Sequence, residues 1–274
     1  EKRSYMPIAS VNGISLNYQV KGAGDLVVLI MGTGSPGRVW ELHQVPALLQ
    51  AGYRVCYFDN RGIAPSSESI GGITIDDLVA DTAALIELVR EDDEKAVVVG
   101  TSMGSRVAQE LTLRRPELVR KAVFLAGHAR LDQFQKTLGE GERALADAKT
   151  ALPPKYAAAV TAVMNLSPTT LADSRAARDW LDLFEFSVAP TAPGVRAQLG
   201  MDETFDRAAA YGKIAVPCLS VGFEHDRMIP AYLSAELAKS IPDAQYVEIS
   251  DVGHYGYLER PDAVNAALLE FIGS

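Results

Sequence analysis

The sequence predicts an α/β protein built on a doubly wound, mostly parallel sheet, and three observations support this fold class. Short, continuous apolar runs recur along the chain, as expected for strands buried on both faces of a parallel sheet. Amphipathic segments with helical spacing separate these runs, and such alternation is typical of parallel α/β sheets. The 274 residues are 48% hydrophobic, which is enough for a large core that needs neither disulfides nor metals.

The predicted strands are of two kinds. Ile14–Val20 alternates apolar and polar residues and is expected to be half exposed. The other strands are continuous apolar runs, at Leu26–Met31, Arg54–Phe58, Ala96–Val99, Ala122–Leu125 and Cys218–Val221, with Tyr246–Ile249 as a further candidate.

The predicted helices lie between the strands. Thr74 is placed to cap one of them, and Asp76 and Asp77 in its first turn interact favourably with the helix dipole. Apolar residues at helical spacing, or a first-turn proline, predict further helices near Val107, Leu233 and Pro261.

The alternation of strands and helices stops between His128 and Lys213. This stretch is rich in Ala, Leu, Arg and Asp, contains several prolines and is expected to be wholly helical. An all-helical insertion between two sheet strands is interpreted as a lid, so residues 128–213 are expected to form a lid within a single domain, 6–274. Glu1–Tyr5 is interpreted as a vector or processing remnant and is excluded from the fold.

Charge and composition limit the partners. The net charge is −9, which argues against nucleic acid or an anionic membrane as the main partner. No apolar run approaches the roughly 20 residues that span a bilayer, so we expect a cytoplasmic protein. The two cysteines, Cys56 and Cys218, are expected to pack within strands. We expect a small-molecule substrate, no cofactor and no metal, whereas the oligomeric state is left open.

The segment Gly100-Thr101-Ser102-Met103-Gly104 follows a predicted strand and precedes a predicted helix. This is the context in which a G-x-S-x-G motif forms a sharp turn that lifts the serine above the sheet. Ser102 is therefore the candidate nucleophile. The Met103 backbone N–H is expected to point at the position of a developing oxyanion.

A serine nucleophile needs a base and an orienting carboxylate. Among the four histidines, His254 follows the last predicted strand and is the candidate base, whereas His43 and His225 are interpreted as structural or loop residues. Asp226, after the Cys218–Val221 strand, is the candidate carboxylate, with Glu224 as the fallback.

The order Ser102, Asp226, His254 and these motifs together make the chain resemble the α/β-hydrolase superfamily from Met6 to its end. The resemblance places the second oxyanion donor at the Thr33 N–H. It departs from the family at Met31-Gly32, where His-Gly is common, and at Ala64, where glycine is common. Arg61, within the landmark Asp59–Gly62, is expected to tie loops together through charge-assisted hydrogen bonds.

Side chains in the lid and near the triad supply candidates for a substrate pocket. The lid aromatics lie in an apolar cluster that forms either the pocket ceiling or the packing of the lid onto the core. The candidate pocket residues are Gly32, Gly34, His128, Tyr156, Met164, Trp180, Phe184 and Tyr255.

We therefore expect a serine hydrolase that cleaves a carboxylic ester or thioester of an apolar small molecule through an acyl-enzyme. The loop Gly32–Gly37 is also similar to the loop of carbon–carbon bond hydrolases, so a carbon–carbon hydrolase, or a lyase or cyclase of natural-product or aromatic metabolism, is an alternative. A non-catalytic ligand-binding protein on a hydrolase scaffold is an alternative of another class.

Overall fold

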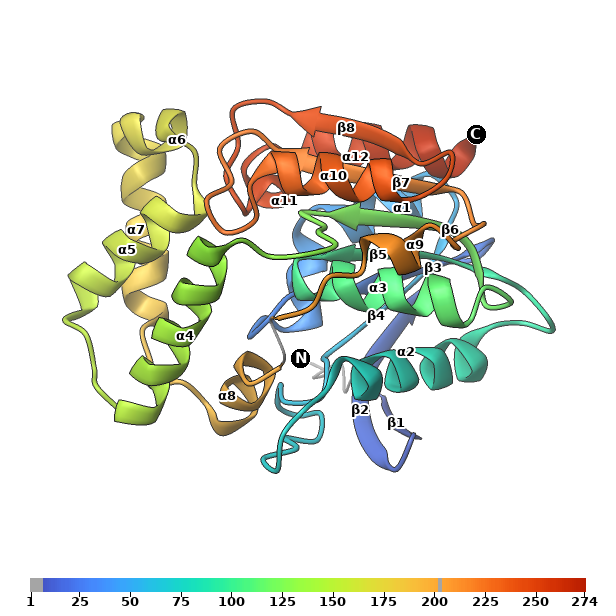
Figure 1. The fold of residues 1–274 in the computed structure, drawn as a ribbon, viewed down its shortest axis with the longest axis horizontal. Helices are drawn as coiled ribbons and strands as arrows, with labels where there is room; N and C mark the ends of the chain where they lie inside the picture. Colours follow the sequence, from blue (N-terminus) through green and yellow to red (C-terminus); the bar gives the residue numbers. More distant parts are fainter. Residues whose placement is uncertain (1–6, 202–203) are drawn as a thin grey trace, which may run out of the picture.

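The computed structural model describes residues 7–201 and 204–274, and Glu1–Tyr5, interpreted above as a remnant, lies outside these ranges. Over the described residues, eight strands form one sheet in the order β1-β2-β4-β3-β5-β6-β7-β8 (Figure 1). β1 pairs antiparallel with β2, and β2 antiparallel with β4, whereas every pairing from β4 to β8 is parallel. The predicted doubly wound, mostly parallel sheet is confirmed.

Every strand predicted from an apolar run is present. The strands are β1 (Ile8–Val11), β2 (Ile14–Lys21), β3 (Leu26–Ile30), β4 (Arg54–Phe58), β5 (Ala96–Thr101), β6 (Val119–Leu125), β7 (Cys218–Phe223) and β8 (Gln245–Ile249). β3, β4, β5 and β7 are buried along their whole length, as strands covered by helices on both faces must be. The short edge strand β1 was not predicted.

Helices connect the strands and cover both faces of the sheet. In the core they are η1 (Gly37–Leu42), α1 (Gln44–Gln50), α2 (Ile75–Val89), α3 (Met103–Arg114), α10 (Ala231–Ser240), α11 (Gly256–Glu259) and α12 (Pro261–Gly273), whereas α9 (Ala208–Tyr211) belongs to the insertion described below. The predicted cap of α2 is confirmed, because the Thr74 side chain accepts the Asp77 N–H and the Asp77 carboxylate accepts the Thr74 N–H.

The core lies in two apolar layers, one on each face of the sheet. Alternate residues of a strand enter opposite layers, so Val28 packs with α2 and α3, whereas Val27 packs with α1 and α12. The buried side chains Leu85 and Leu268 represent the two layers. This sandwich fixes the carboxyl ends of the parallel strands, where the candidate site residues lie.

A helical insertion (residues 128–213) leaves the sheet after β6 and returns at β7. It contains α4 (Gln133–Ala148), α5 (Pro154–Asn165), α6 (Pro168–Ala172), α7 (Ser174–Ser187), α8 (Pro193–Leu199) and α9. α4 to α8 lie together to one side of the sheet, at the left of Figure 1. The segment between α8 and α9 is not helical where it is described, so the expectation of a wholly helical stretch is too broad there.

The two ends of the insertion meet next to the core. The Arg207 N–H donates to the Ala129 carbonyl oxygen at 2.8 Å, and Arg130 forms an isolated bridge with Asp206. The Arg207 guanidinium also donates to the buried Glu110 carboxylate of α3 at 2.7 Å. These contacts form a two-stranded neck that anchors the insertion to the core.

Over the described ranges, no helix combines the length and the apolar character needed to cross a bilayer.

Candidate active site

Ser102 occupies the turn between β5 and α3 in a strained backbone conformation. Its φ of 54° and ψ of −119° lie outside the regions that residues other than glycine ordinarily adopt. The turn is so tight that a Cβ atom on Gly100 would lie 2.0 Å from the Gly104 carbonyl oxygen, and one on Gly104 would lie 2.2 Å from the Ile30 oxygen. Both glycines of the motif are therefore required by the close approach of backbone to backbone.

His254 and Asp226 meet at the carboxyl ends of β8 and β7. His254 Nδ1 lies 2.7 Å from Asp226 Oδ2, and the Asp226 carboxylate is fully buried. The other carboxylate oxygen accepts the Ile229 N–H at 2.8 Å. The two interactions fix the Asp226 side chain, which in turn orients the imidazole and holds a proton on Nδ1.

Glu224, the fallback carboxylate, is directed elsewhere. Its Oε2 accepts the Asp251 N–H at 2.7 Å, and it belongs to the same loop as Asp226. The structure thus brings Asp226, and not Glu224, to His254.

The loop that carries His254 is held from both sides. The Glu259 carboxylate accepts the Gly253 N–H at 2.6 Å and the Ser167 N–H at 2.9 Å. The Tyr255 N–H donates to the Asn165 carbonyl oxygen at 3.0 Å, so the end of α5 packs directly on this loop. The sequence analysis did not identify Glu259 or Asn165, because no local motif marks a contact between segments so far apart.

The loop after β3 offers a backbone N–H opposite Met103. In this loop Gly34 donates its N–H to Gln198 Oε1 at 2.9 Å, and Gln198 Nε2 donates to the Arg61 carbonyl oxygen at 2.8 Å. Within the described parts of the chain, neither the Thr33 N–H nor the Met103 N–H has a hydrogen-bond acceptor. Both donors are therefore available to a substrate oxygen, and Gln198, which the sequence analysis did not single out, fixes the loop.

The Asp59–Gly62 segment forms hydrogen bonds with both ends of the loop that follows β3. Asp59 Oδ1 accepts the Gly37 N–H at 2.7 Å, and Asn60 Nδ2 donates to the Met31 carbonyl oxygen at 3.0 Å. Arg61 forms two hydrogen bonds of 2.6 Å with the buried Asp81 of α2. This is the structural role expected for Arg61, and a loop built in this way does not need the histidine common in the family.

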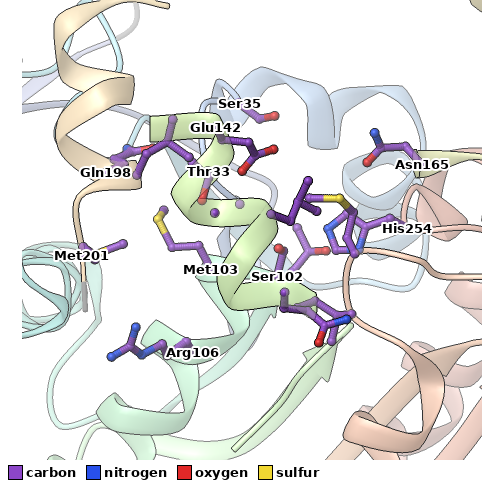
Figure 2. A pocket seen from close by; sticks show the side chains of 18 of the residues that line it. Thr33, Ser35, Ser102, Met103, Arg106, Glu142, Asn165, Gln198, Met201 and His254 are labelled. Atoms are coloured by element: carbon purple, nitrogen blue, oxygen red, sulfur yellow. The ribbon is translucent and has the colours of Figure 1, made fainter. Parts of the chain in front are cut away.

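Ser102 and His254 line one cavity of about 490 Å³. Figure 2 shows Ser102 between Met103 on one side and His254 on the other, with Glu142 and Asn165 contributed by the insertion. A volume of this size is within the usual range of about 300–1,000 Å³ for small-molecule sites.

The predicted pocket residues fall into three groups. Gly32, His128 and Tyr255 line this cavity, as do both proposed oxyanion donors, and Gly34 lies just outside it with its N–H on Gln198. Met164 lines a neighbouring cavity within the insertion.

The other predicted pocket residues lie outside both cavities. Tyr156 is exposed, and Trp180 and Phe184 of α7 pack against each other and against Tyr255, with ring centroids 5.5 to 6.4 Å apart. These two aromatics thus join the insertion to the His254 loop, which is the packing alternative left open by the sequence.

One part of the cavity wall is formed by a cluster of charged and aromatic side chains. The Arg106 guanidinium lies 3.7 Å from the centre of the Phe205 ring, and the His128 ring lies beside the same ring. Burial, and then the positive charge of Arg106, lower the pKa of His128 to about 3. His128 is therefore neutral at physiological pH. His43 and His225 do not line either cavity.

Comparisons with known proteins identify the family to which this fold belongs. The family model for the alpha/beta hydrolase fold matches residues 25–261. The chain is 45% identical over 261 residues to "Putative non-heme bromoperoxidase BpoC" of Mycobacterium tuberculosis, covering 95% of this chain and 98% of that protein. It is 31% identical to "Putative carbamate hydrolase RutD" of Azorhizobium caulinodans, with 98% of each chain covered.

A solved structure shows the same likeness in three dimensions. The crystal structure of the Mycobacterium tuberculosis BpoC protein superposes with a TM-score of 0.88 at 41% identity, covering 100% of this chain and 98% of that one. The fold, the order of its strands and these relatives lead to one conclusion: the chain belongs to the α/β-hydrolase family.

Proposed function

We propose that the protein is a serine hydrolase that cleaves a carboxylic ester or thioester of an apolar small molecule. One observation above all supports the proposal. Ser102, in a strained backbone conformation, shares a cavity with His254, and His254 Nδ1 lies 2.7 Å from the buried Asp226 carboxylate. A binding protein has no need of this combination, because each group serves proton transfer to and from a nucleophile.

The proposed reaction has two halves. Ser102 Oγ attacks the substrate carbonyl carbon, its proton passes to His254 Nε2, and the N–H groups of Thr33 and Met103 stabilise the oxyanion. The alcohol or thiol leaves with the proton from His254. Water then attacks the acyl-serine with His254 as base, so one ester and one water give one acid and one alcohol.

One contact of this mechanism forms on substrate binding. Within the described residues, the Ser102 hydroxyl donates no hydrogen bond to the His254 ring, and catalytic hydrogen bonds are often long or misaligned until substrate is bound.

We propose that the helical insertion acts as the lid of the site. The two buried free cysteines, Cys56 and Cys218, support a cytoplasmic location.

Covalent labelling tests the proposal. A fluorophosphonate probe is expected to label the wild type and not Ser102→Ala, and Ser102→Ala is expected to lose ester hydrolysis. Ser35→Ala is a matched control, because Ser35 lines the same cavity without a proposed chemical role. Labelling that persists in Ser102→Ala would overturn the proposal. Turnover of a vinylogous diketone without ester hydrolysis would favour the carbon–carbon hydrolase instead.

A second candidate activity is favoured by the name of the 45% identical relative, a bromoperoxidase. In this reaction a carboxylic acid acylates Ser102 with loss of water, and hydrogen peroxide then attacks the acyl-serine, which gives a peracid and frees the serine. The peracid transfers one oxygen atom to bromide, which gives hypobromite and returns the carboxylic acid. It uses the same nucleophile. Bromination of a phenol by the wild type in bromide, peroxide and acetate, abolished in Ser102→Ala, would support it.

A further inference from the structure

A second cavity lies in the helical insertion and adjoins the first. Its volume is about 1,340 Å³, well above that of an ordinary small-molecule pocket. The two cavities share seven lining residues: Leu138, Glu142, Leu145, Thr161, Asn165, Thr191 and Met228. The cavity at Ser102 therefore adjoins a larger space inside the insertion, which we call the insertion groove.

The insertion groove lies between one stripe of α4 and one stripe of α5. On α5, Ala157, Val160 and Met164 line it at spacings of three and four residues, which is one face of a helix. Ala158 and Ala162, on another face of α5, are buried. On α4 the lining residues recur at helical spacing in the same way, and they include Phe134, Leu138, Gly141 and Leu145. Two amphipathic helices thus present apolar stripes to the same space.

These stripes leave large apolar side chains exposed. Phe134 is 57% exposed, Leu145 39% and Val160 38%, although all three line the groove. Contiguous apolar surface of this kind usually marks a binding site. Because the groove adjoins the cavity at Ser102, a substrate bound at Ser102 is near enough to extend one arm into it.

One part of the boundary between the two cavities lies beside His254. Asn165, whose carbonyl oxygen holds the Tyr255 N–H, lines both cavities, and so does Met228, two residues after Asp226. Figure 2 shows Asn165 on the same side of Ser102 as His254, with Arg106 on the other side. Because His254 returns its proton to the leaving oxygen or sulfur, the leaving group lies beside this part of the boundary, next to the groove.

We propose, on the basis of the serine hydrolase function above, that the insertion groove binds an extended apolar alcohol or thiol arm of the substrate. The acyl group then occupies the smaller space bounded by Arg106, His128 and Phe205. The enzyme is thus selective for a long or bulky apolar leaving group joined to a compact acyl group.

Two ester series test the assignment in the wild type. The first is ethyl, hexyl and octyl butyrate, and the second is ethyl butyrate and ethyl octanoate, with acid release followed in a pH-stat. A buried methylene group is worth up to about a fourfold gain, so we expect kcat/KM to rise at least about tenfold from ethyl to octyl butyrate. Ethyl octanoate is expected to be no better than ethyl butyrate. A flat alcohol series, or a gain confined to the acyl series, would overturn the inference.

A matched pair of variants tests the place of binding. Ala157→Trp fills the groove from α5, whereas Ala159→Trp adds the same side chain at an exposed position of that helix outside both cavities. We expect Ala157→Trp to lose at least about tenfold on octyl butyrate and less than about twofold on ethyl butyrate. Ala159→Trp should keep the wild-type ratio, and equal ratios in the two variants would refute the assignment.

The readouts separate the two proposals. Turnover of ethyl butyrate reports whether each variant is folded, and the wild-type series decides the inference even if Ala157→Trp does not fold. If the probe labels Ser102 but kcat/KM does not change along the alcohol series, the groove assignment alone is refuted. No ester turnover and no labelling would remove the proposed function and the groove assignment together.

Discussion

Asp226→Asn should disable the base without unfolding the protein. The Ile229 N–H needs an acceptor, so the amide oxygen of the new side chain takes over that hydrogen bond. The amide nitrogen then faces His254 Nδ1, 2.7 Å from the present carboxylate oxygen, and Nδ1 has to become an acceptor. The ring proton moves to Nε2, and the imidazole can no longer accept the proton of Ser102.

The size of the loss follows from the cost of restoring the active tautomer. Turning the amide around leaves two buried groups mispaired, at about 1–3 kcal/mol each, or about 2–6 kcal/mol together. At about 1.4 kcal/mol per factor of ten, this alone predicts a 30-fold to 10⁴-fold decrease in kcat. Loss of the negative charge beside the developing imidazolium moves the expected value toward the upper end.

The assay is steady-state hydrolysis of a butyrate ester at neutral pH, with Glu224→Gln as the matched control. Glu224 contacts the Asp251 N–H and not the imidazole, so Glu224→Gln should stay within about threefold of the wild type. The reasoning is refuted if Asp226→Asn keeps more than a tenth of the wild-type kcat, or if the two variants lose activity equally.

Three further predictions concern stability. Gly100→Ala should lower the free energy of unfolding in urea by about 3 kcal/mol or more, because its Cβ would lie 2.0 Å from a backbone oxygen, whereas Gly71→Ala, with open space around it, should stay within about 0.5 kcal/mol. Burial lowers the pKa of His128 to about 3, so unfolding takes up a proton below the ordinary histidine value. The free energy of unfolding should therefore fall by up to about 1.4 kcal/mol per pH unit between pH 6.5 and about pH 3, and this contribution should disappear in His128→Gln. Arg61→Met should cost about 3–5 kcal/mol in thermal unfolding by leaving Asp81 buried without its cation, and Arg61→Met with Asp81→Leu should recover most of that loss.

The central sheet could be predicted because strands that are buried on both faces need apolar residues at every position, which gives continuous apolar runs in the sequence. Val27 and Val28 enter opposite layers, so neither position tolerates a polar residue. β1 (Ile8–Val11) was missed for the opposite reason. It is a short edge strand with alternating burial, and four residues of this kind do not differ from a loop in composition.

The candidate site could be predicted for those residues that lie in a short, recognisable sequence motif. Ser102 and His254 stand at strand ends in recognisable turns, but the choice between Asp226 and Glu224 depended on how one loop folds. The insertion groove left no such signal. Its α5 wall includes Ala157, a small residue that draws no attention in a sequence, and its shape is set by helix packing.

The neck of the insertion has an evolutionary consequence. Ala129 and Arg207 are hydrogen-bonded where the chain departs and returns, so the intervening residues form a closed loop whatever their length. The entropic cost of such a loop grows only slowly with length, and the core is therefore little affected when this segment is lengthened, shortened or exchanged. With the proposed roles of Ser102 and His254, exchange of this one segment would present the same nucleophile and base to unrelated compounds, which offers a route to the diverse activities for which the relatives are named.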